Sequence, residues 1–211
     1  MKMVPISPNV SARMQEKRRK ILECALELFA EQGYDNTPVK DIIDKSGFGT
    51  GTFYKYFNNR EDVLQTLLSE FLDQIIDRVN EYFAREKDLY LRFVGAKLVI
   101  LEVFIQNQKM AGIYSRVTGI SSESIRECIM EFEERFIQFT SKNIQFGIKQ
   151  GVFREVPAVP LAHSVLAVIK HMIFKWTVLK DISTKEMLNM TTIILEIMAV
   201  SLVVKNNPQE P

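Results

Sequence analysis

Apolar residues recur at spacings of three and four along almost the whole of this 211-residue chain. No segment shows the sustained alternation of apolar and polar residues that a half-buried β-strand requires. Because residues three and four apart share one face of a helix, the pattern predicts an all-α protein with about nine helices. We predict these helices at residues 12–32, 38–46, 50–56, 60–84, 89–106, 109–117, 123–149, 161–180 and 184–205.

Several predicted helix ends carry residues that stop or cap a helix. Gly33 follows the first helix and supplies the left-handed conformation that commonly ends one. Thr37 is predicted to cap the second helix, with Pro38 at the first helical position, where its missing N–H costs nothing. Asn59 is predicted to start the long fourth helix, and Ser183 to Glu186 has the pattern of a capping box for the last helix.

The composition is that of an ordinary soluble globular protein, with 46% hydrophobic and 25% charged residues and a net charge of +1. The basic residues are concentrated near the N-terminus, where residues 1–60 hold ten Lys or Arg against seven Asp or Glu. The steepest excess runs from Arg13 to Lys20, with five basic residues and one acidic residue. This segment suits contact with phosphates, although a solvated helix start would look the same.

Other features exclude several classes of protein. Cys24 and Cys128 lie far apart within helical patterns, so neither a disulfide framework nor a metal site is predicted, and a cytoplasmic location fits. No secretory signal is visible, and the most apolar stretch, Met187–Val204, contains Glu196 and is too short to span a bilayer. The sequence has no nucleophile–base pair, Glu-x-x-His motif or phosphate loop, so neither an enzyme nor a cofactor is predicted.

Residues 37–56 have the layout of a helix-turn-helix: two short helices joined by a turn that contains Gly47 and Gly49. In the second helix, Phe53 and Phe57 lie four apart and can form a buried side, which leaves hydroxyl, aromatic and cationic side chains exposed. Such side chains can bond phosphates and base edges in a major groove. Gly51 is costly inside a helix; either close approach of a DNA backbone or tight packing near the turn would explain it.

Residues 18–64 resemble the DNA-binding domain of the TetR family of transcriptional regulators. The most specific stretch is Gly51 to Leu64, where a glycine, two aromatic residues, a cap, a cation and a pair of carboxylates follow in the family's order. The resemblance also covers Ile21 to Phe29, Gly33-Tyr34-x-x-Thr37 and Ile42-Ile43-x-x-x-Gly47.

The resemblance implies a set of DNA-contacting residues. Tyr54 and Tyr56 would bind phosphates, Arg60 would clamp a flanking phosphate, and Thr37 would aim the second helix at the DNA backbone. The full set of predicted DNA-binding residues is Thr37, Lys40, Thr50, Gly51, Thr52, Tyr54, Lys55, Tyr56 and Arg60. The sequence departs from the family at Thr50, where Lys or Arg is frequent, and at Phe48-Gly49, so its base preference is open.

The rest of the chain resembles the family only in its layout of a helical bundle that binds an effector and dimerises. We therefore expect a flexible arm at 1–11, a helix-turn-helix domain at 12–58, an effector-binding and dimerisation domain at 59–205 and a disordered tail at 206–211. An apolar or aromatic effector would lie among Phe71, Phe93, Phe104, Phe132, Phe136, Phe139, His171 and Trp176. For any single phenylalanine, a place in the ordinary core is the competing interpretation.

The last two predicted helices are the candidates for dimerisation, because the final helix is apolar almost all round. Their predicted interface residues are Leu161, Val165, Val168, Ile194, Ile197, Met198 and Leu202. The expected function is that of a ligand-released homodimeric repressor that binds a pseudo-palindromic double-stranded DNA site, without membrane attachment. The alternative is a DNA-binding regulator that has no small-molecule effector and is controlled by a protein partner.

Overall fold

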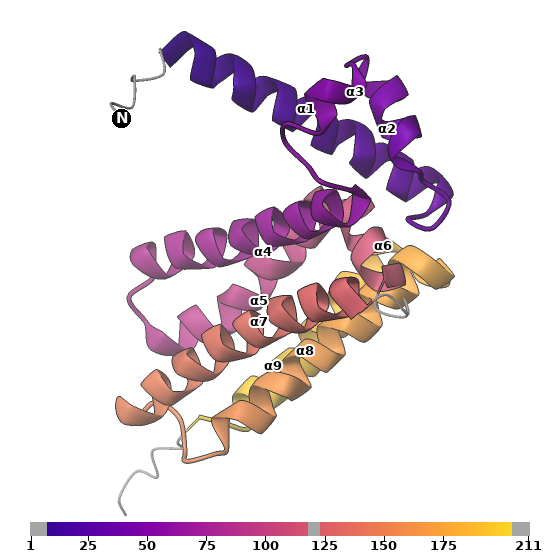
Figure 1. Cartoon of the computed structure of the whole chain (residues 1–211). Helices are drawn as coiled ribbons and strands as arrows, with labels where there is room; N and C mark the ends of the chain where they lie inside the picture. The colour runs from indigo at the N-terminus through magenta and orange to yellow at the C-terminus, as the bar shows by residue number, and fades with distance from the viewer. Residues whose placement is uncertain (1–7, 118–122, 204–211) are drawn as a thin grey trace, which may run out of the picture. The chain divides into compact units, whose positions relative to one another are not determined.

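The computed structural model describes residues 8–117 and 123–203, with side chains from Ala12 onward. The expectations for residues 1–11, 119–122 and 206–211 lie wholly or partly outside these residues. The described chain is all-α, as the sequence predicts (Figure 1). Its helices are α1 (Pro8–Gln32), α2 (Val39–Ser46), α3 (Thr50–Phe53), α4 (Arg60–Arg85), α5 (Leu89–Gln106), α6 (Gln108–Val117), α7 (Glu123–Lys149), α8 (Ala158–Phe174), the π-helical turn η1 (Lys175–Leu179) and α9 (Thr184–Val200).

Backbone contacts divide the chain into two compact units, and the division falls within α4, between Leu67 and Leu68. The first unit holds α1, α2, α3 and the start of α4. Its core is built from the apolar stripe of α1 together with one face of each later helix. The fully buried residues of this core are Ile21, Ala25, Phe29, Ile42, Phe53, Phe57, Val63 and Leu64.

The first unit follows the sequence at several helix ends, although α1 begins earlier than predicted, at Pro8. Gly33 and Gly47 both adopt positive φ, at 86° and 72°, as their places after α1 and α2 require. Asn59 caps α4, because its side chain accepts from the Asp62 N–H at 2.8 Å. The cap predicted for Thr37 is wrong: the residue before α2 is Pro38, with no side-chain cap, and the Thr37 hydroxyl donates to the Gly33 carbonyl at 2.7 Å.

The second unit is a bundle of the remaining part of α4 and of α5 to α9. Neighbouring helices in this bundle include α7 with α8 and α9 with both α5 and α8 (Figure 1). The capping box predicted for the last helix is confirmed, since the Ser183 hydroxyl accepts from the Glu186 N–H and the Glu186 carboxylate accepts from the Ser183 N–H.

Two helix boundaries in the bundle differ from the prediction. α9 ends at Val200 rather than at residue 205, because Leu202 turns back and its carbonyl accepts from the Arg154 N–H at 2.8 Å. α8 begins at Ala158 and continues into η1, and this segment, Ala158–Leu179, is long and apolar enough by length and composition to cross a membrane. Because it packs against α6, α7 and α9 in the bundle, we interpret it as a core helix.

Candidate DNA-binding surface and effector cavity

The recognition segment, Thr50 to Tyr56, is anchored by two buried phenylalanines. Phe53 and Phe57 are 1% and 2% exposed, and their ring centroids lie 5.9 Å apart. The α-helix covers only Thr50–Phe53, and the chain continues through a tight turn in which the Tyr56 N–H donates to the Phe53 carbonyl at 2.9 Å. The helix predicted for 50–56 is therefore shorter than expected, while its buried side is the predicted one.

The opposite side of this segment faces solvent. Thr50, Gly51, Tyr54 and Lys55 are exposed, whereas Thr52 and Tyr56 are half-buried. The Tyr54 ring packs edge-on against Phe53 with centroids 5.3 Å apart, which restrains an otherwise exposed aromatic side chain. The surface therefore presents hydroxyl groups and one ammonium group on a rigid support.

Gly51 has no packing reason within the described structure. A Cβ atom added at this position would meet no atom within 4 Å. Tight packing near the turn, one of the two explanations that the sequence left open, is therefore removed. Space remains here for the close approach of an external group.

Two basic residues of α1 lie beside the recognition segment. A groove of about 370 Å³, which we call the α1–α3 groove, is lined by Arg13, Met14, Lys17, Thr52, Lys55 and Tyr56. Three of these side chains are cationic and two carry hydroxyl groups, the combination that binds phosphate oxygens. The structure thus joins the basic start of α1, a segment noted for its charge alone, to the predicted recognition residues.

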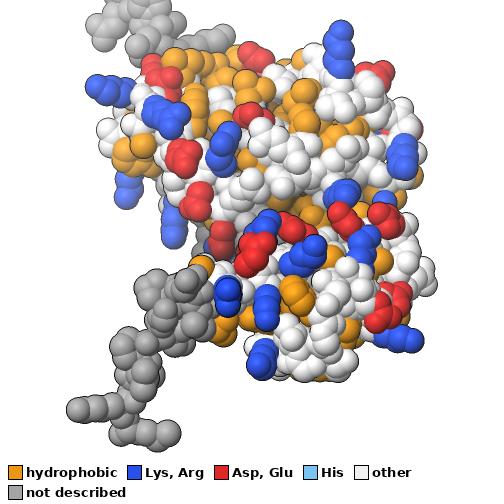
Figure 2. Space-filling model, turned by 90° about the horizontal axis from the view of Figure 1, so that it is seen from above, with side chains coloured by type: hydrophobic (Ala, Val, Ile, Leu, Met, Phe, Trp, Pro, Cys, Tyr) orange, Lys and Arg blue, Asp and Glu red, His pale blue; other side chains and the backbone are white. Residues whose placement is uncertain are grey.

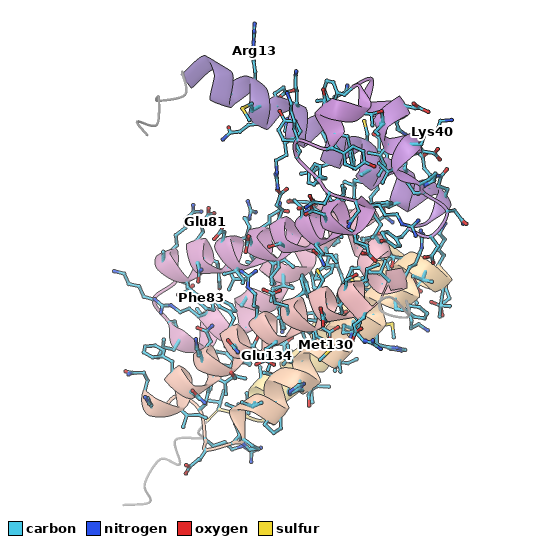
Figure 3. The ribbon with its side chains drawn as sticks, in the orientation of Figure 1. Arg13, Lys40, Glu81, Phe83, Met130 and Glu134 are labelled. Carbon is cyan, nitrogen blue, oxygen red and sulfur yellow. The ribbon has the colours of Figure 1, made fainter. Side chains whose placement is uncertain are left out.

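Outside the α1–α3 groove, several basic side chains of the first unit pair with acidic ones, Arg19 with Glu16 and Glu23 and Lys45 with Glu27. Arg13 on α1 and Lys40 on α2 each point away from their own helix into solvent (Figure 3). In the view from above, Lys and Arg side chains alternate with Asp and Glu side chains across the visible face (Figure 2). Attraction of a polyanion therefore depends on where individual cations stand.

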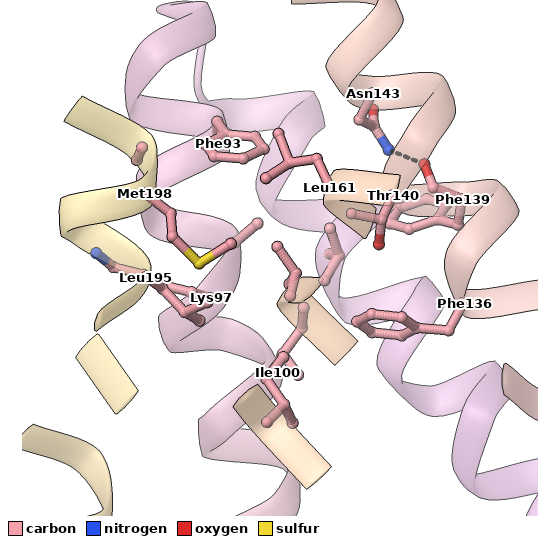
Figure 4. Close-up of a pocket in the computed structure, with 15 residues that line it drawn as sticks. Phe93, Lys97, Ile100, Phe136, Phe139, Thr140, Asn143, Leu161, Leu195 and Met198 are labelled. Atoms are coloured by element: carbon pink, nitrogen blue, oxygen red, sulfur yellow. Dashed lines mark hydrogen bonds between the residues drawn. The ribbon is translucent and has the colours of Figure 1, made fainter. Parts of the chain in front are cut away.

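The second unit contains an apolar cavity of about 60 Å³ between five helices, α4, α5, α7, α8 and α9 (Figure 4). We call it the bundle cavity. Its lining residues are Val79, Phe93, Ala96, Lys97, Ile100, Phe136, Phe139, Thr140, Asn143, Leu161, Val165, Ile169, Leu195, Met198 and Ala199. The Asn143 amide donates to the Phe139 carbonyl at 2.8 Å, so part of the small polar content is already engaged.

Lys97 is the charged residue of this lining. It is 6% exposed, and its ammonium lies on the α9 side, away from the middle of the cavity (Figure 4). The ammonium donates to the Thr192 carbonyl at 3.4 Å and lies 3.9 Å from the Glu196 carboxylate. Burial lowers the pKa of Lys97, and the Glu196 charge opposes that shift. The cavity wall itself is formed by the aliphatic stem.

The predicted aromatic residues divide into two groups. Phe93, Phe136 and Phe139 line the bundle cavity. The other phenylalanines form a separate core cluster, in which Phe71 meets Phe104 at 5.1 Å and Phe132 at 6.4 Å between ring centroids. These three rings pack on one another and are not part of the lining of the bundle cavity.

Trp176 and His171 also lie away from the bundle cavity. Trp176 is buried in η1, and its indole N–H donates to the Thr184 hydroxyl at 3.1 Å. His171 is exposed and lines a polar hollow between α6, α7 and α8, together with His163. In that hollow the Tyr114 hydroxyl donates to Glu133 at 3.1 Å, and burial raises the pKa of Tyr114.

An exposed apolar stripe runs along α9. Met190, Ile193, Ile197 and Val200 are spaced at three and four and are 39–66% exposed. Of the seven predicted interface residues, only Ile197 belongs to this stripe. Leu161, Val165 and Met198 line the bundle cavity and Leu202 is 3% exposed, so these four do not face outward; Val168 and Ile194 are half-buried.

The sequence and the fold of this chain are similar to those of known proteins. Residues 21–67 match the family model described as bacterial regulatory proteins, tetR family. The chain is 50% identical to a solved TetR-family transcriptional regulator from Syntrophomonas wolfei, and the two structures superpose with a TM-score of 0.85. The match covers 91% of this chain and 99% of that one. The chain belongs to the TetR family. It is therefore a DNA-binding transcriptional regulator, as the sequence predicts.

Two further relatives of this TetR-family regulator carry functional descriptions. The HTH-type transcriptional repressor KstR2 of Rhodococcus jostii is 25% identical over 82% of this chain and 86% of its own length. The FadR regulator of Bacillus subtilis, solved in complex with stearoyl-CoA, is 22% identical, covers 87% of this chain and 98% of its own, and has a TM-score of 0.77. The last of these shows the fold alone.

For two residues of the TetR-family motif, the structure shows contacts that the resemblance did not imply. Thr37 is fully buried, so its side chain is a structural element of the loop before α2. Arg60 directs its guanidinium to the carbonyls of Tyr34, Asp35 and Thr37, at 3.0–3.3 Å. Lys40 and the residues from Thr50 to Tyr56 remain predicted DNA contacts.

Some site residues of this TetR-family regulator escaped the sequence reasoning. Lys97 interrupts an apolar helix, and that interruption was the available signal. Thr140 and Asn143 carry no comparable signal, since polar residues at such spacing on a long helix are ordinary on a solvated face. Met190 is exposed whereas Met187 on the same helix is fully buried, a difference that the sequence does not show.

Proposed function

We propose that this regulator is a cytoplasmic homodimeric repressor that leaves its DNA site when an apolar small molecule enters the bundle cavity. One observation carries the proposal: the chain combines an exposed polar recognition segment, Thr50 to Tyr56, with a cavity whose walls are almost entirely apolar. The two features are those of a DNA reader and of a small-molecule site, respectively.

The recognition segment would enter a major groove. Its hydroxyl groups and Lys55 can reach base edges and phosphates, and the open space beside Gly51 admits the DNA backbone. The α1–α3 groove would hold a flanking phosphate between Lys17 and Lys55. Because few cations are available, each contact carries a large share of the binding energy.

The effector would enlarge the bundle cavity. A volume of about 60 Å³ admits only a few water-sized groups, so a larger apolar molecule must move the surrounding helices apart. α4 contributes Val79 to this cavity, and its first residue, Arg60, belongs to the first unit. The complex of the FadR relative with stearoyl-CoA supports a fatty acyl compound as the first class to test. The effector needs to favour the released state by only a few kcal/mol.

Dimerisation would proceed through α8 and α9. The stripe of Met190, Ile193, Ile197 and Val200 exposes apolar surface that a second copy would cover. Two recognition segments related by a twofold axis match successive major grooves, about 34–36 Å apart, on a pseudo-palindromic site. The name of the KstR2 relative supports repression rather than activation.

Selection from random duplex DNA at about 100 mM salt tests the proposal. We expect enrichment of one pseudo-palindromic site, and release of that duplex by oleoyl-CoA, oleate or decanoate in fluorescence anisotropy. Enrichment of no palindrome overturns the repressor assignment. A palindrome that no apolar compound releases, with no compound raising the unfolding temperature, favours control by a protein partner instead; a ligand at 100 times its Kd would stabilise the fold by about 2.7 kcal/mol.

The α1–α3 groove gives a residue-level prediction for the same duplex. We expect Lys17→Ala and Lys55→Ala each to weaken binding and to reduce the slope of log affinity against log salt by about 0.9, because each removes one phosphate contact. Lys185→Ala, at an exposed lysine in the first turn of α9, is the matched control and should leave both quantities unchanged. An unchanged slope for both groove variants would show that the groove does not hold phosphate.

A further inference from the structure

Arg60, the first residue of α4, makes a dense set of contacts with the loop between α1 and α2. One guanidinium nitrogen, Nη1, shares its two N–H groups among the carbonyls of Tyr34, Asp35 and Thr37, at 3.1, 3.0 and 3.3 Å. The guanidinium also lies over the Tyr34 ring, 4.6 Å from its centroid. The partners of Arg60 are therefore three converging backbone dipoles and one aromatic face, all within the first unit.

The loop that Arg60 holds is itself rigid. The Thr37 hydroxyl donates to the Gly33 carbonyl at 2.7 Å, and the Thr37 N–H donates to the Tyr34 carbonyl at 3.1 Å. The Gln32 amide donates to the Asn36 carbonyl at 3.0 Å. Pro38 and α2 follow directly. A group fixed to this loop is therefore fixed to the beginning of the helix-turn-helix.

The other end of the connection is equally well defined. Asn59 caps α4, and the Asp62 carboxylate accepts from the Asn58 N–H at 3.0 Å. The backbone of Arg60 thus lies in a capped first turn, and α4 continues without interruption to Arg85. The bundle cavity is lined by a residue of this same helix, Val79.

We propose that Arg60 is a positioning residue, whose guanidinium fixes the first turn of α4 to the loop before α2 and thereby sets the orientation of α2 and α3 relative to that turn. The DNA-binding surface and the first turn of α4 then act as one body within the first unit. This role replaces the phosphate contact that the family motif implies for Arg60. It depends on the shape of the guanidinium, whose flat face lies over the Tyr34 ring while Nη1 reaches the loop carbonyls, whereas a phosphate contact depends on positive charge. The proposal does not depend on the identity of an effector.

The experiment tests whether DNA binding depends on the shape of the Arg60 guanidinium or on its positive charge. The full-length Arg60→Lys and Arg60→Met proteins are titrated against the duplex that the wild-type protein selects, at several salt concentrations. Positioning predicts that both variants lose about tenfold in affinity, the scale of a lost charge-assisted hydrogen bond, with an unchanged salt slope. A phosphate contact predicts recovery by Arg60→Lys and a slope reduced by about 0.9 in Arg60→Met. That second pattern overturns the proposal.

A stability control tests whether Arg60 affects DNA binding only through the stability of the fold. The control variants are Ile21→Val and Ile21→Ala, at a fully buried position of α1. We expect one to lower the unfolding temperature less than the Arg60 variants do and the other to lower it more. We expect these core variants to keep wild-type affinity at a temperature where they are folded. If they lose affinity in proportion to stability, as Arg60→Met does, then Arg60 acts only through stability and the proposal is wrong.

The Tyr34 ring supplies an independent variant pair. Tyr34→Phe keeps the aromatic face and removes a buried hydroxyl that has no hydrogen-bond partner among the described residues, so DNA affinity should be unchanged. Tyr34→Leu removes the face and should lower affinity in the same direction as Arg60→Lys, with the salt slope again unchanged. Equal affinities for the Phe and Leu variants would count against a positioning role for the guanidinium.

Discussion

The recognition segment and the bundle cavity are built in opposite ways. The recognition segment places a few exposed polar side chains on a four-residue helix that two buried phenylalanines hold in place. The bundle cavity is formed by fifteen residues of long helices, and its walls are nearly all apolar. Each polar contact on the first surface is separate, whereas every residue around the cavity packs against several others.

This difference teaches how each site responds to change. Removal of one exposed donor abolishes one contact and leaves the fold intact, because surface substitutions cost little stability. A change in the cavity wall alters volume and packing together, so ligand binding and stability shift at once. DNA binding should therefore depend on individual residues and on pairing of two subunits, and effector binding on the space that many residues share.

Loss of dimerisation is the largest effect that we expect, and it would show that the recognition segment does not act alone. In the double variant Ile193→Glu, Ile197→Glu, two charges replace exposed apolar residues on the α9 stripe. We expect a monomer in sedimentation analysis and a loss of roughly a hundredfold or more in operator affinity, because two linked half-sites bind with avidity. The fold should persist, since both positions face solvent.

Met130→Glu is the matched control for this double variant. Met130 is 63% exposed on α7, outside the α9 stripe, and its substitution should leave both dimerisation and DNA binding unchanged. A double variant that stays dimeric would place the interface elsewhere and would break the link between the stripe and DNA affinity.

Local sequence patterns were sufficient for much of the first unit. Gly33 and Gly47 adopt the left-handed conformation, and Phe53 and Phe57 are buried, because each of these outcomes depends on a residue's own backbone or on its place in a helical period. The contact between Arg60 and the Tyr34 carbonyl could not be predicted in the same way. It joins residues 26 positions apart, and no periodic pattern specifies it.

In the second unit, helical period predicted the elements but not the site. Phe132 and Phe136 lie four apart on the same face of α7, yet one fills the core cluster and the other lines the cavity. What separates them is the partner across the bundle: Phe71 packs on Phe132, while the space opposite Phe136 is left partly empty. A cavity is a property of several helices packed together, and a single helical stripe does not contain that information.

Filling the bundle cavity should weaken effector binding and leave DNA binding unchanged. Val165→Phe adds an aromatic ring at a lining position of α8. We expect apolar effectors to bind at least about tenfold more weakly, since a lost methylene-sized space already costs 1–3 kcal/mol in a hydrophobic pocket. Operator affinity without effector should stay within a factor of about two, which is within the usual range for independent sites. Calorimetry with oleoyl-CoA and anisotropy with DNA measure the two quantities.

Val159→Phe makes the same substitution on the same helix, at a position that is 47% exposed and outside the cavity lining. Wild-type effector binding is expected for this control. If Val165→Phe lowers operator affinity as strongly as effector affinity, the two sites are not as independent as their construction indicates.

The smallest predicted effect concerns the buried charge at the cavity edge. Lys97 has a lowered pKa because burial disfavours its ammonium form, and its ion pair with Glu196 is long and half open to solvent. At pH values below its lowered pKa the lysine is charged in both the folded and the unfolded chain, so the folded state bears the cost of burying the charge. We therefore expect Lys97→Met to raise the free energy of unfolding by about 1 kcal/mol, at the lower end for replacing a buried charge with an apolar residue.

Lys97 should also make the free energy of unfolding depend on pH. Between the lowered pKa of Lys97 in the folded protein and its ordinary value in the unfolded chain, the unfolded state binds more protons, so wild-type stability rises with pH across that interval. Lys97→Met should remove this rise, and the two stability curves from urea unfolding should converge at alkaline pH. Lys170→Met, which breaks the ion pair with Glu133, should lower stability instead. If Lys97→Met also destabilises the protein at neutral pH, the bond to the Thr192 carbonyl outweighs the cost of the buried charge, and the cavity edge is held by individual polar contacts like the recognition segment.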